Sequence, residues 1–306
     1  IFDLSRATIP NINLAFDKGT LTSEQLVQLY LNRITDYDKQ GPKINAVISL
    51  NPDCIPLAQK LDTERKAQGP RSLMHGIPVV VKDIIDKEGM PTTGGCDKLK
   101  SSYPSRDAEV IRNLARAGAI VLAKVNTNDW FIQSPMSCST LGGQTRNPHN
   151  LNYTVGGSSC GTGAALAANF APVGIGTDTS GSVLMPSAHC GLFGMIPSSG
   201  LISRAGVMPL GLTLDRIGVM ARSAFDMAAL LSSVIGWDPE DLTTNEALDL
   251  FPQQQYETDL AVRSIGSFRI GVLREMWLEG PTYTCLLYTS DAADEGLGVD
   301  LGGRRI

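Results

Sequence analysis

The sequence has 306 residues, of which 42% are hydrophobic and 19% charged, and its formal net charge is −5. A chain of this length and apolar content can bury a sizeable core, but its acidic balance provides no basic face for a nucleic acid and it has no run of about 18 apolar residues that could span a bilayer. We therefore expect a protein that binds no nucleic acid and has no membrane span.

Two helices are predicted near the start of the chain. Residues 22–39 open with Thr22 and Gln25 in the spacing of a capping box, and a largely apolar stripe at helical spacing follows. This stripe consists of Leu26, Leu29, Tyr30, Arg33 and Ile34. A second helix is expected over residues 56–68, where a Gly-Pro pair ends it.

A buried strand with a lysine at its end is predicted over residues 74–86. Its "IPVVV" segment is typical of a strand that is buried on both faces, and Lys82 follows directly. The next segment, "DAEVIRNLARAGAIVLAKV", predicts a helix, a C-terminal cap at Gly118 and a strand over residues 119–125. Together these elements form the second half of a parallel β-α-β unit.

The order strand, loop, helix recurs further along the chain. The loop "GGSSCGTG" at residues 156–163 leads into the helix "AALAANF", and the short strand "VGIG" runs into the loop "GTDTSGSVLMP" at residues 176–186. Another strand is expected over residues 268–275. This order predicts an α/β fold with a mixed or mainly parallel sheet. No repeat or linker marks a boundary, so we expect one domain over residues 1–284.

The last segment, residues 285–306, differs from the rest of the chain. It shows neither helical nor strand periodicity, and "CLLYTSDAADE" and "VDLGGRRI" resemble the translation of transposase-type sequencing adapters. We expect the native sequence to stop near Thr284, the alternative being a disordered natural C-terminus. A continuous coding exon through Cys285 would contradict the adapter interpretation.

The cysteines and the first residue carry less information. The cysteines form no C-x-x-C pair and no cluster with histidine at metal-ligand spacing, so we expect mostly buried, reduced thiols and no metal site. They are Cys54, Cys96, Cys138, Cys160, Cys190 and Cys285. The chain begins with Ile1 rather than methionine, so it says nothing about a targeting segment, and a cytoplasmic location is an expectation only.

The two serine-rich loops indicate a nucleophilic hydroxyl, which needs a base within hydrogen-bond reach. The only histidines are His75, His149 and His189, and none lies in a setting typical of a catalytic base. Lys82 is the alternative, because burial can lower the pKa of a lysine until the amine is neutral. The competing interpretation is a lysine that extends from the strand end into solvent.

Each loop has a functional and a competing interpretation. The glycines of residues 156–163 permit unusual backbone torsions, so this loop could hold a serine hydroxyl or cradle a phosphate. It lacks both G-x-G-x-x-G and a Gly-Lys-Ser/Thr ending, which disfavours the phosphate. In the second loop, consecutive N–H groups around Gly181 could converge on an oxyanion. Cys160 is a less favoured nucleophile than the serines.

Taken together, these segments resemble the amidase signature family, hydrolases built on a serine, a second serine and a lysine. The resemblance covers most of residues 1–284 and rests on an ordered set of motifs: "GIPVVVKD", "GGQTRNP", "GGSSCGTGAALAA", "GIGTDTSGSVLMPSAHCGLFGMIPSSGLISRAGVMPL" and "DRIGVMARSAFDMAALL". It implies a mixed, largely parallel sheet covered by helices on both faces and incomplete at the C-terminus, because the family domain is longer. It implies no metal or organic cofactor.

The resemblance also implies residue roles in the hydrolysis of a linear amide through an acyl-enzyme. Ser182 would be the nucleophile, Lys82 the base, and Ser158 the serine between them, held by a cis peptide bond. The implied oxyanion hole consists of the backbone N–H groups of Thr179, Ser180, Gly181 and Ser182, and the implied supporting residues are Ser159 and Asp178. Thr177, Asp178 and Thr179 are expected to brace the loop rather than to react.

The sequence departs from the family pattern inside these loops. Ser180 and Cys160 each stand where the family commonly has glycine, and Leu184 and Met185 stand where many members carry an arginine. The missing arginine argues against a carboxylate-bearing substrate and, less strongly, against full activity.

Three functions are compatible with the sequence. The leading hypothesis is an amidase acting on small-molecule or peptide amides, nearest to the peptide amidase and general amidase branch because of "RNP" and "GIGTDT". The second is the glutaminase subunit of a tRNA-dependent amidotransferase, which would need partner subunits. The third is a catalytically silent, truncated fragment. The oligomeric state is not predicted.

Overall fold

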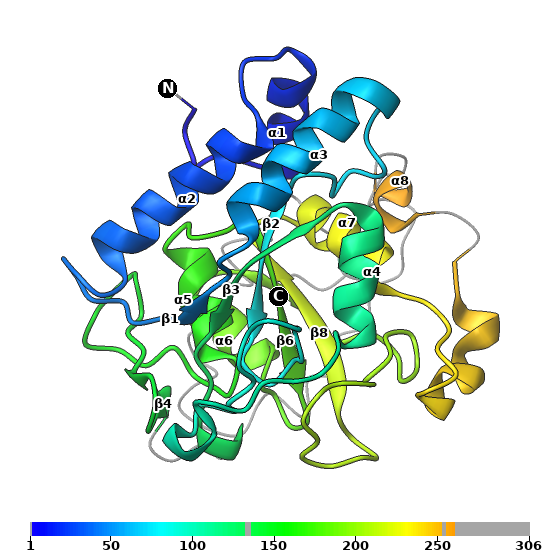
Figure 1. The fold of residues 1–306 in the computed structure, drawn as a ribbon. Coiled ribbons are helices and arrows are strands. Elements are labelled where there is room, and N and C mark those ends of the chain that lie inside the picture. Colours follow the sequence, from blue (N-terminus) through cyan, green and yellow to red (C-terminus); the bar gives the residue numbers. More distant parts are fainter. Residues whose placement is uncertain (1, 132–135, 253–254, 261–306) are drawn as a thin grey trace, which may run out of the picture. The chain divides into compact units, whose positions relative to one another are not determined.

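The computed structural model describes residues 2–131, 136–252 and 255–260, all of which fall within one compact unit. These residues form a sheet that is packed between helices (Figure 1). The predicted strand over residues 268–275 and the tail over residues 285–306 lie outside the described residues. So do the predicted domain end near residue 284 and the expected C-terminal incompleteness of the sheet.

The central sheet has six strands in the order β1-β3-β2-β6-β8-β7. Their bounds are Val47–Leu50 (β1), Pro78–Lys82 (β2), Ile120–Val125 (β3), Val173–Asp178 (β6), Phe193–Met195 (β7) and Arg216–Ala221 (β8). β2 is parallel to both β3 and β6, β1 and β8 run in the opposite direction, and β7 is antiparallel to β8. Most strands therefore run one way, which confirms the predicted mixed, largely parallel sheet. A separate hairpin pairs β4 (Cys138–Ser139) with β5 (Gly143–Gln144).

The helices predicted over residues 22–39 and 56–68, before Gly118 and after the "GGSS" loop are all present, and the described residues form further helices that were not predicted. Their bounds are Ile9–Asp17 (α1), Ser23–Tyr37 (α2), Cys54–Gln68 (α3), Glu109–Ala117 (α4), Cys160–Ala167 (α5), Leu184–His189 (α6), Ala224–Val234 (α7) and Tyr256–Asp259 (α8). Short 3₁₀ turns lie at Asp97–Leu99, Asp129–Phe131 and Leu242–Leu250. The capping box before α2 is formed as predicted: Thr22 Oγ1 accepts from the Gln25 N–H at 3.1 Å, and Gln25 Oε1 accepts from the Thr22 N–H at 3.0 Å.

Two predicted helix starts were too late. α3 begins at Cys54 rather than at residue 56, because a proline fits in the first turn, where backbone N–H groups need no helical partner. α5 begins at Cys160, inside the glycine-rich loop, rather than after it. The predicted cap at Gly118 is confirmed, since this glycine ends α4 in the left-handed conformation with a φ of 81°.

Glycines on β6 allow α5 and the loop before it to lie close to the sheet. α5 packs against β2, β3, β6 and β8, while α7 packs against β6, β7 and β8. A Cβ atom at Gly174 would lie 2.7 Å from Thr162 Cγ2, and one at Gly176 would lie 2.6 Å from Ser159 Oγ. Both distances are too short for any side chain. The small residues of β6 therefore bring the "GGSS" loop directly onto the sheet.

Replacing Gly176 with alanine is expected to lower the free energy of unfolding by about 1–3 kcal/mol, because the added methyl group overpacks a filled site. Urea denaturation would measure the change. Gly211→Ala is the matched control, since a Cβ atom there would meet nothing closer than 3.5 Å and the residue has no left-handed φ. Equal unfolding midpoints for the two variants would contradict this packing argument.

Five of the six cysteines lie among the described residues, and none of these five is in a disulfide bond. Cys54, Cys160 and Cys190 are buried, Cys96 and Cys138 are half-buried, and all five are free. Within the described part of the chain, no group of three or more His, Cys, Asp or Glu side chains is arranged to hold a metal ion. No helix among the described residues is long and apolar enough to cross a membrane.

Candidate active site

Lys82 is the last residue of β2 and lies at the centre of the sheet, between β3 and β6. Its side chain is completely buried. The Nζ atom lies 2.7 Å from Ser158 Oγ and 2.9 Å from Thr177 Oγ1. The alternative of a lysine that extends into solvent is therefore wrong, because both neighbouring strands and the "GGSS" loop enclose the side chain.

Burial changes the protonation of Lys82. Loss of hydration lowers its pKa to about 7, against the opposing effects of Cys160, Asp178 and Asp215. An amine with this pKa is substantially neutral at physiological pH, unlike an ordinary lysine. It can therefore accept a proton from the adjacent hydroxyl.

The loop that carries Ser158 is held against the end of β6. The Gly157–Ser158 peptide bond is cis, as the resemblance implied. The Ser159 N–H donates to the Ser182 carbonyl at 3.2 Å, while Ser159 Oγ donates to the Thr177 carbonyl at 3.1 Å and accepts from the Thr177 N–H at 3.2 Å. Ser159 thus joins the two serine loops.

The loop that carries Ser182 is shaped by a carboxylate at the end of β6. Asp178 accepts hydrogen bonds from the N–H groups of Gly181 at 2.7 Å and Val183 at 2.6 Å. Gly181 has a φ of 108°, a conformation that side chains disfavour. This places Ser182, which is 5% exposed, just before α6. Of the four N–H groups assigned to the oxyanion hole, that of Gly181 already donates to Asp178.

The histidines lie apart from the hydrogen bonds of Lys82 and the loop serines. His75 is buried, with Nδ1 accepting from the Arg71 N–H at 3.2 Å and Nε2 lying 2.9 Å from the Leu61 carbonyl. His149 Nε2 lies 2.9 Å from the Cys190 carbonyl, and His189 is exposed at the end of α6. None of these hydrogen bonds involves Lys82 or a loop serine.

Cys160 has a thiol that is unsuited to attack. It is completely buried at the start of α5, and burial raises its pKa to about 11. The reactive species of a cysteine is the thiolate, which is scarce at neutral pH when the pKa is this high. The low preference for Cys160 as a nucleophile agrees with this environment.

Thr177 has a contact that the sequence analysis did not predict. Its hydroxyl lies 2.9 Å from Lys82 Nζ, in addition to the backbone contacts that brace the loop. The contact follows from the pairing of β2 with β6, in which Val81 lies opposite Ile175. Strand pairing between segments so far apart along the chain has no local signature in the sequence.

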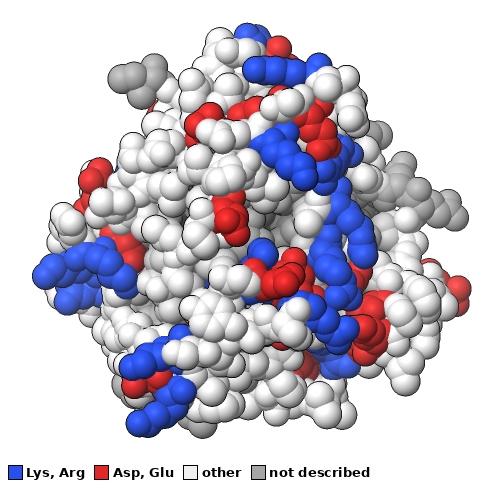
Figure 2. Space-filling model, in the orientation of Figure 1, with Lys and Arg blue, Asp and Glu red and all other residues white. Residues whose placement is uncertain are grey.

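A pocket of about 210 Å³ opens beside Ser158, Thr177 and Thr179. Ser182 is not among its lining residues. Its apolar lining residues include Met208, Leu210, Leu212 and Ile217. The charged side chains that line the pocket are Arg204, Asp215, Arg216, Glu240 and Asp241. On the face shown in Figure 2, acidic and basic side chains lie next to one another around a central hollow.

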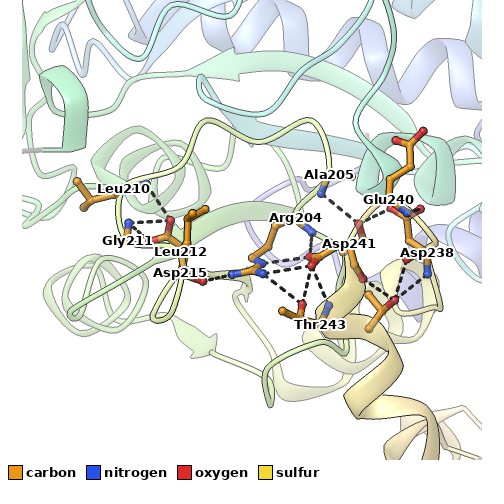
Figure 3. Close-up of polar contacts among 12 residues, drawn as sticks. Arg204, Ala205, Leu210, Gly211, Leu212, Asp215, Asp238, Glu240, Asp241 and Thr243 are labelled. Carbon is orange, nitrogen blue, oxygen red and sulfur yellow. Dashed lines mark hydrogen bonds and ion pairs between the residues drawn. The ribbon is translucent and has the colours of Figure 1, made fainter.

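Arg204 links two segments of the pocket wall (Figure 3). Its guanidinium donates to both Asp241 carboxylate oxygens at 3.1 Å, and to the Leu212 carbonyl. Although burial acts against it, hydrogen bonding from Arg204 holds the pKa of Asp241 below its usual range. This ion pair keeps the segment before β8 next to the turn that contains Asp241. Neither residue was predicted, because they come together only in the folded chain.

Comparison with known proteins relates this geometry to a family. The model of the Amidase family matches residues 25–295. A probable amidase of Arabidopsis thaliana is 37% identical over 279 residues, which cover 89% of this chain and 54% of that protein. A glutamyl-tRNA(Gln) amidotransferase subunit from Chloroflexus aurantiacus is 37% identical over 280 residues, with coverage of 91% and 55%.

Solved structures show the same relationship. Native peptide amidase from Stenotrophomonas maltophilia aligns with a TM-score of 0.79 and 37% identity, covering 85% of this chain and 54% of that one. A peptide amidase in complex with the competitive inhibitor chymostatin aligns with a TM-score of 0.86 and 35% identity, covering 96% and 60%. The chain spans about half the length of the curated relatives it matches.

Proposed function

The chain belongs to the amidase signature family, and from this premise we propose that it hydrolyses a linear carboxylic amide to an acid and an amine or ammonia. The observation that carries the proposal is the 2.7 Å contact between the buried amine of Lys82 and the hydroxyl of Ser158, in a loop that Ser159 ties to Ser182. A buried, neutral amine beside a serine is the arrangement that proton transfer from a hydroxyl requires.

The proposed reaction begins with proton transfer through Ser158. Its hydroxyl donates a proton to neutral Lys82 and takes one from Ser182, whose Oγ attacks the amide carbonyl carbon. As the carbon–oxygen double bond opens, negative charge collects on the carbonyl oxygen. The C–N bond then breaks, the relay returns a proton to the leaving amine, and an acyl-enzyme remains on Ser182. Water cleaves this ester by the same proton route.

We propose that the oxyanion is stabilised by the backbone N–H groups of residues 179–182. Because the Gly181 N–H donates to Asp178, the groups of Thr179, Ser180 and Ser182 are the candidate donors. Removal of one such donor from other enzymes costs about 2.7–4 kcal/mol in transition-state stabilisation. The hydrogen bonds that Asp178 accepts from Gly181 and Val183 would then fix the direction of the neighbouring donors.

The pocket supports a substrate with an apolar group next to the scissile amide. Met208, Leu210 and Leu212 are among the apolar residues that line it. Leu184, where many family members carry an arginine, is 49% exposed and cannot pair with an anion. We therefore propose small acyl amides and C-terminally amidated peptides rather than carboxylate-bearing amides. Release of ammonia or amine from these compounds by the full-length protein tests the proposal.

Measurement of ammonia or amine release also distinguishes the two other functions, a glutaminase subunit and a catalytically silent fragment. Relatives that are glutamyl-tRNA(Gln) amidotransferase subunits, at 35–37% identity, favour the glutaminase as the second candidate. Ammonia released from glutamine only in the presence of partner subunits would support it. A protein that cleaves no amide, and whose Ser182 does not react with a fluorophosphonate, would instead be catalytically silent.

The pH dependence of the reaction should follow the protonation of Lys82. This residue acts as a base only when it is neutral, and its pKa is about 7. We therefore expect kcat/KM to rise with pH and to level off above about pH 7, with a tenfold loss for each pH unit below that point. Initial rates on an uncharged amide between pH 5 and 9 would show this. A flat profile down to pH 5 would contradict Lys82 as the base.

A further inference from the structure

Asp215 begins the motif "DRIGVMARSAFDMAALL", and the proposed reaction leaves it without a role. It lies between a turn of the pocket wall and the loop that carries Ser182. The turn is formed by the N–H groups of Leu214 and Asp215, which both donate to the Gly211 carbonyl at 2.8 Å. β8 starts at the next residue, Arg216, and Asp215 itself lines the pocket. Its carboxylate therefore lies where the sheet borders the pocket.

Both carboxylate oxygens of Asp215 accept hydrogen bonds. Oδ2 accepts from the Leu210 N–H at 2.8 Å and from the Gly211 N–H at 3.0 Å. Oδ1 accepts from the Gly211 N–H at 3.0 Å and from the Thr179 hydroxyl at 2.5 Å. One side chain thus holds the pocket wall through two backbone groups and the Ser182 loop through one hydroxyl (Figure 3 shows the wall).

Thr179 is one of the residues of the Ser182 loop that line the pocket. It follows Asp178 directly, and both Thr179 and Asp215 line the pocket. Asp178 holds the far part of the loop through the N–H groups of Gly181 and Val183. Thr179 is held by a different carboxylate, and its methyl group faces the turn, since a Cβ atom on Gly211 would lie 3.5 Å from Thr179 Cγ2. The loop is therefore anchored at two places by two aspartates.

We propose that Asp215 is a positioning residue that fixes the backbone of Thr179 relative to the pocket wall. The inference rests on the proposed function, because it concerns the N–H groups that would bind the oxyanion. Hydrogen bonds to a carboxylate are stronger than those between neutral groups. Asp215 thus fixes the position of the oxyanion loop relative to Leu210 and Leu212. A substrate group that binds to these leucines then has its carbonyl oxygen placed at the N–H groups of the loop. The effect acts on the chemical step rather than on binding.

The test compares a variant that removes the hydroxyl of Thr179 with a variant that keeps it. Thr179→Val has nearly the same shape but cannot donate to Asp215, whereas Thr179→Ser can. We expect Thr179→Val to lower kcat by about 10- to 100-fold with little change in KM, because a small misplacement of the catalytic groups costs rates of this order. The kcat of Thr179→Ser should be restored to within about threefold of the wild-type value, because its hydroxyl can still donate to Asp215.

A double-mutant cycle gives the result that a merely structural role would not produce. In the Asp215→Ala background, Thr179→Val should cause no further loss of kcat, because its hydrogen-bond partner is already absent. Melting temperatures of all variants check that each one folds, and the Thr179 comparison stands even where Asp215→Ala does not fold. Normal kcat in Thr179→Val, an effect on KM alone, or multiplicative losses in the cycle would overturn the inference.

The cycle also distinguishes this inference from the function on which it rests. If the wild type hydrolyses amides and Ser182→Ala does not, the proposed function stands, and an unaffected Thr179→Val then overturns the role of Asp215 alone. If the wild type shows no turnover that depends on Ser182, the proposed function fails and the role of Asp215 in positioning the oxyanion loop fails with it.

Discussion

Ser182→Ala is expected to lower kcat by about 10⁴- to 10⁶-fold while the protein stays folded. Loss of the attacking oxygen removes the acyl-enzyme route, and in other serine hydrolases it costs rates of this order. The side chain is small and almost fully buried, and Asp178 shapes its loop through backbone groups, which the substitution leaves in place. Steady-state rates on a C-terminally amidated peptide, together with circular dichroism, would measure both effects.

A second serine nearby provides the control for Ser182→Ala. Ser187 on α6 is also buried, and its hydroxyl donates to the Val183 carbonyl at 2.8 Å rather than to any group in the proposed relay. Ser187→Ala should therefore cost some stability, about 1 kcal/mol for one hydrogen bond, and leave kcat close to that of wild type. Turnover in Ser182→Ala above one hundredth of the wild-type rate would contradict the assignment of the nucleophile.

Lys82→Met is expected to lower kcat/KM by about 10²- to 10⁴-fold, the usual contribution of a general base. Methionine fills similar space without an amine, so the variant leaves no large cavity. The substitution removes the hydrogen-bond partner of the Ser158 and Thr177 hydroxyls, so we expect the free energy of unfolding to fall by about 1–3 kcal/mol. Rates at pH 8, where the wild-type amine is neutral, give the comparison its largest range. Wild-type rates in Lys82→Met would rule out the lysine as base.

The chain contains a second buried lysine that should behave in the opposite way. Lys124 on β3 is also completely buried, but its Nζ lies 3.4 Å from Asp83 Oδ1 and donates to Thr92 Oγ1 at 3.0 Å. Lys124→Met leaves the buried Asp83 carboxylate without its counter-ion, a change that typically costs about 3–5 kcal/mol. We expect it to lower the melting temperature strongly, whereas Lys82→Met lowers activity. The same substitution thus separates a structural from a catalytic lysine.

Local signals in the sequence predicted the elements that position the site. The β-branched run before Lys82, the capping box at Thr22 and the glycine cap at Gly118 each follow from interactions within a few residues. The strands β1, β7 and β8 were not predicted. They are short or pair in an antiparallel way with distant segments, as β8 does with β6, so their place in the sheet depends on contacts that no window of sequence contains.

The residues of the site likewise fall into those that the sequence predicted and those that only the folded structure identifies. The order of the motifs pointed to Lys82 and Ser158, and the structure places their side chains in contact. By contrast, the roles of Thr177 and Asp215 depend on where β6 and β8 bring them relative to the serine loops. Threonine and aspartate are common in loops, and only the three-dimensional arrangement distinguishes these two from the rest.

Covalent labelling of Ser182 tests the central claim most directly. The full-length protein would be treated with a fluorophosphonate, which reacts with activated serine hydroxyls, and the modified peptide would be identified by mass spectrometry. The account predicts one adduct, on Ser182, that forms at a rate lowered by Lys82→Met and that is absent from Ser182→Ala. An adduct on another residue, or no adduct in a protein that hydrolyses amides, would contradict it.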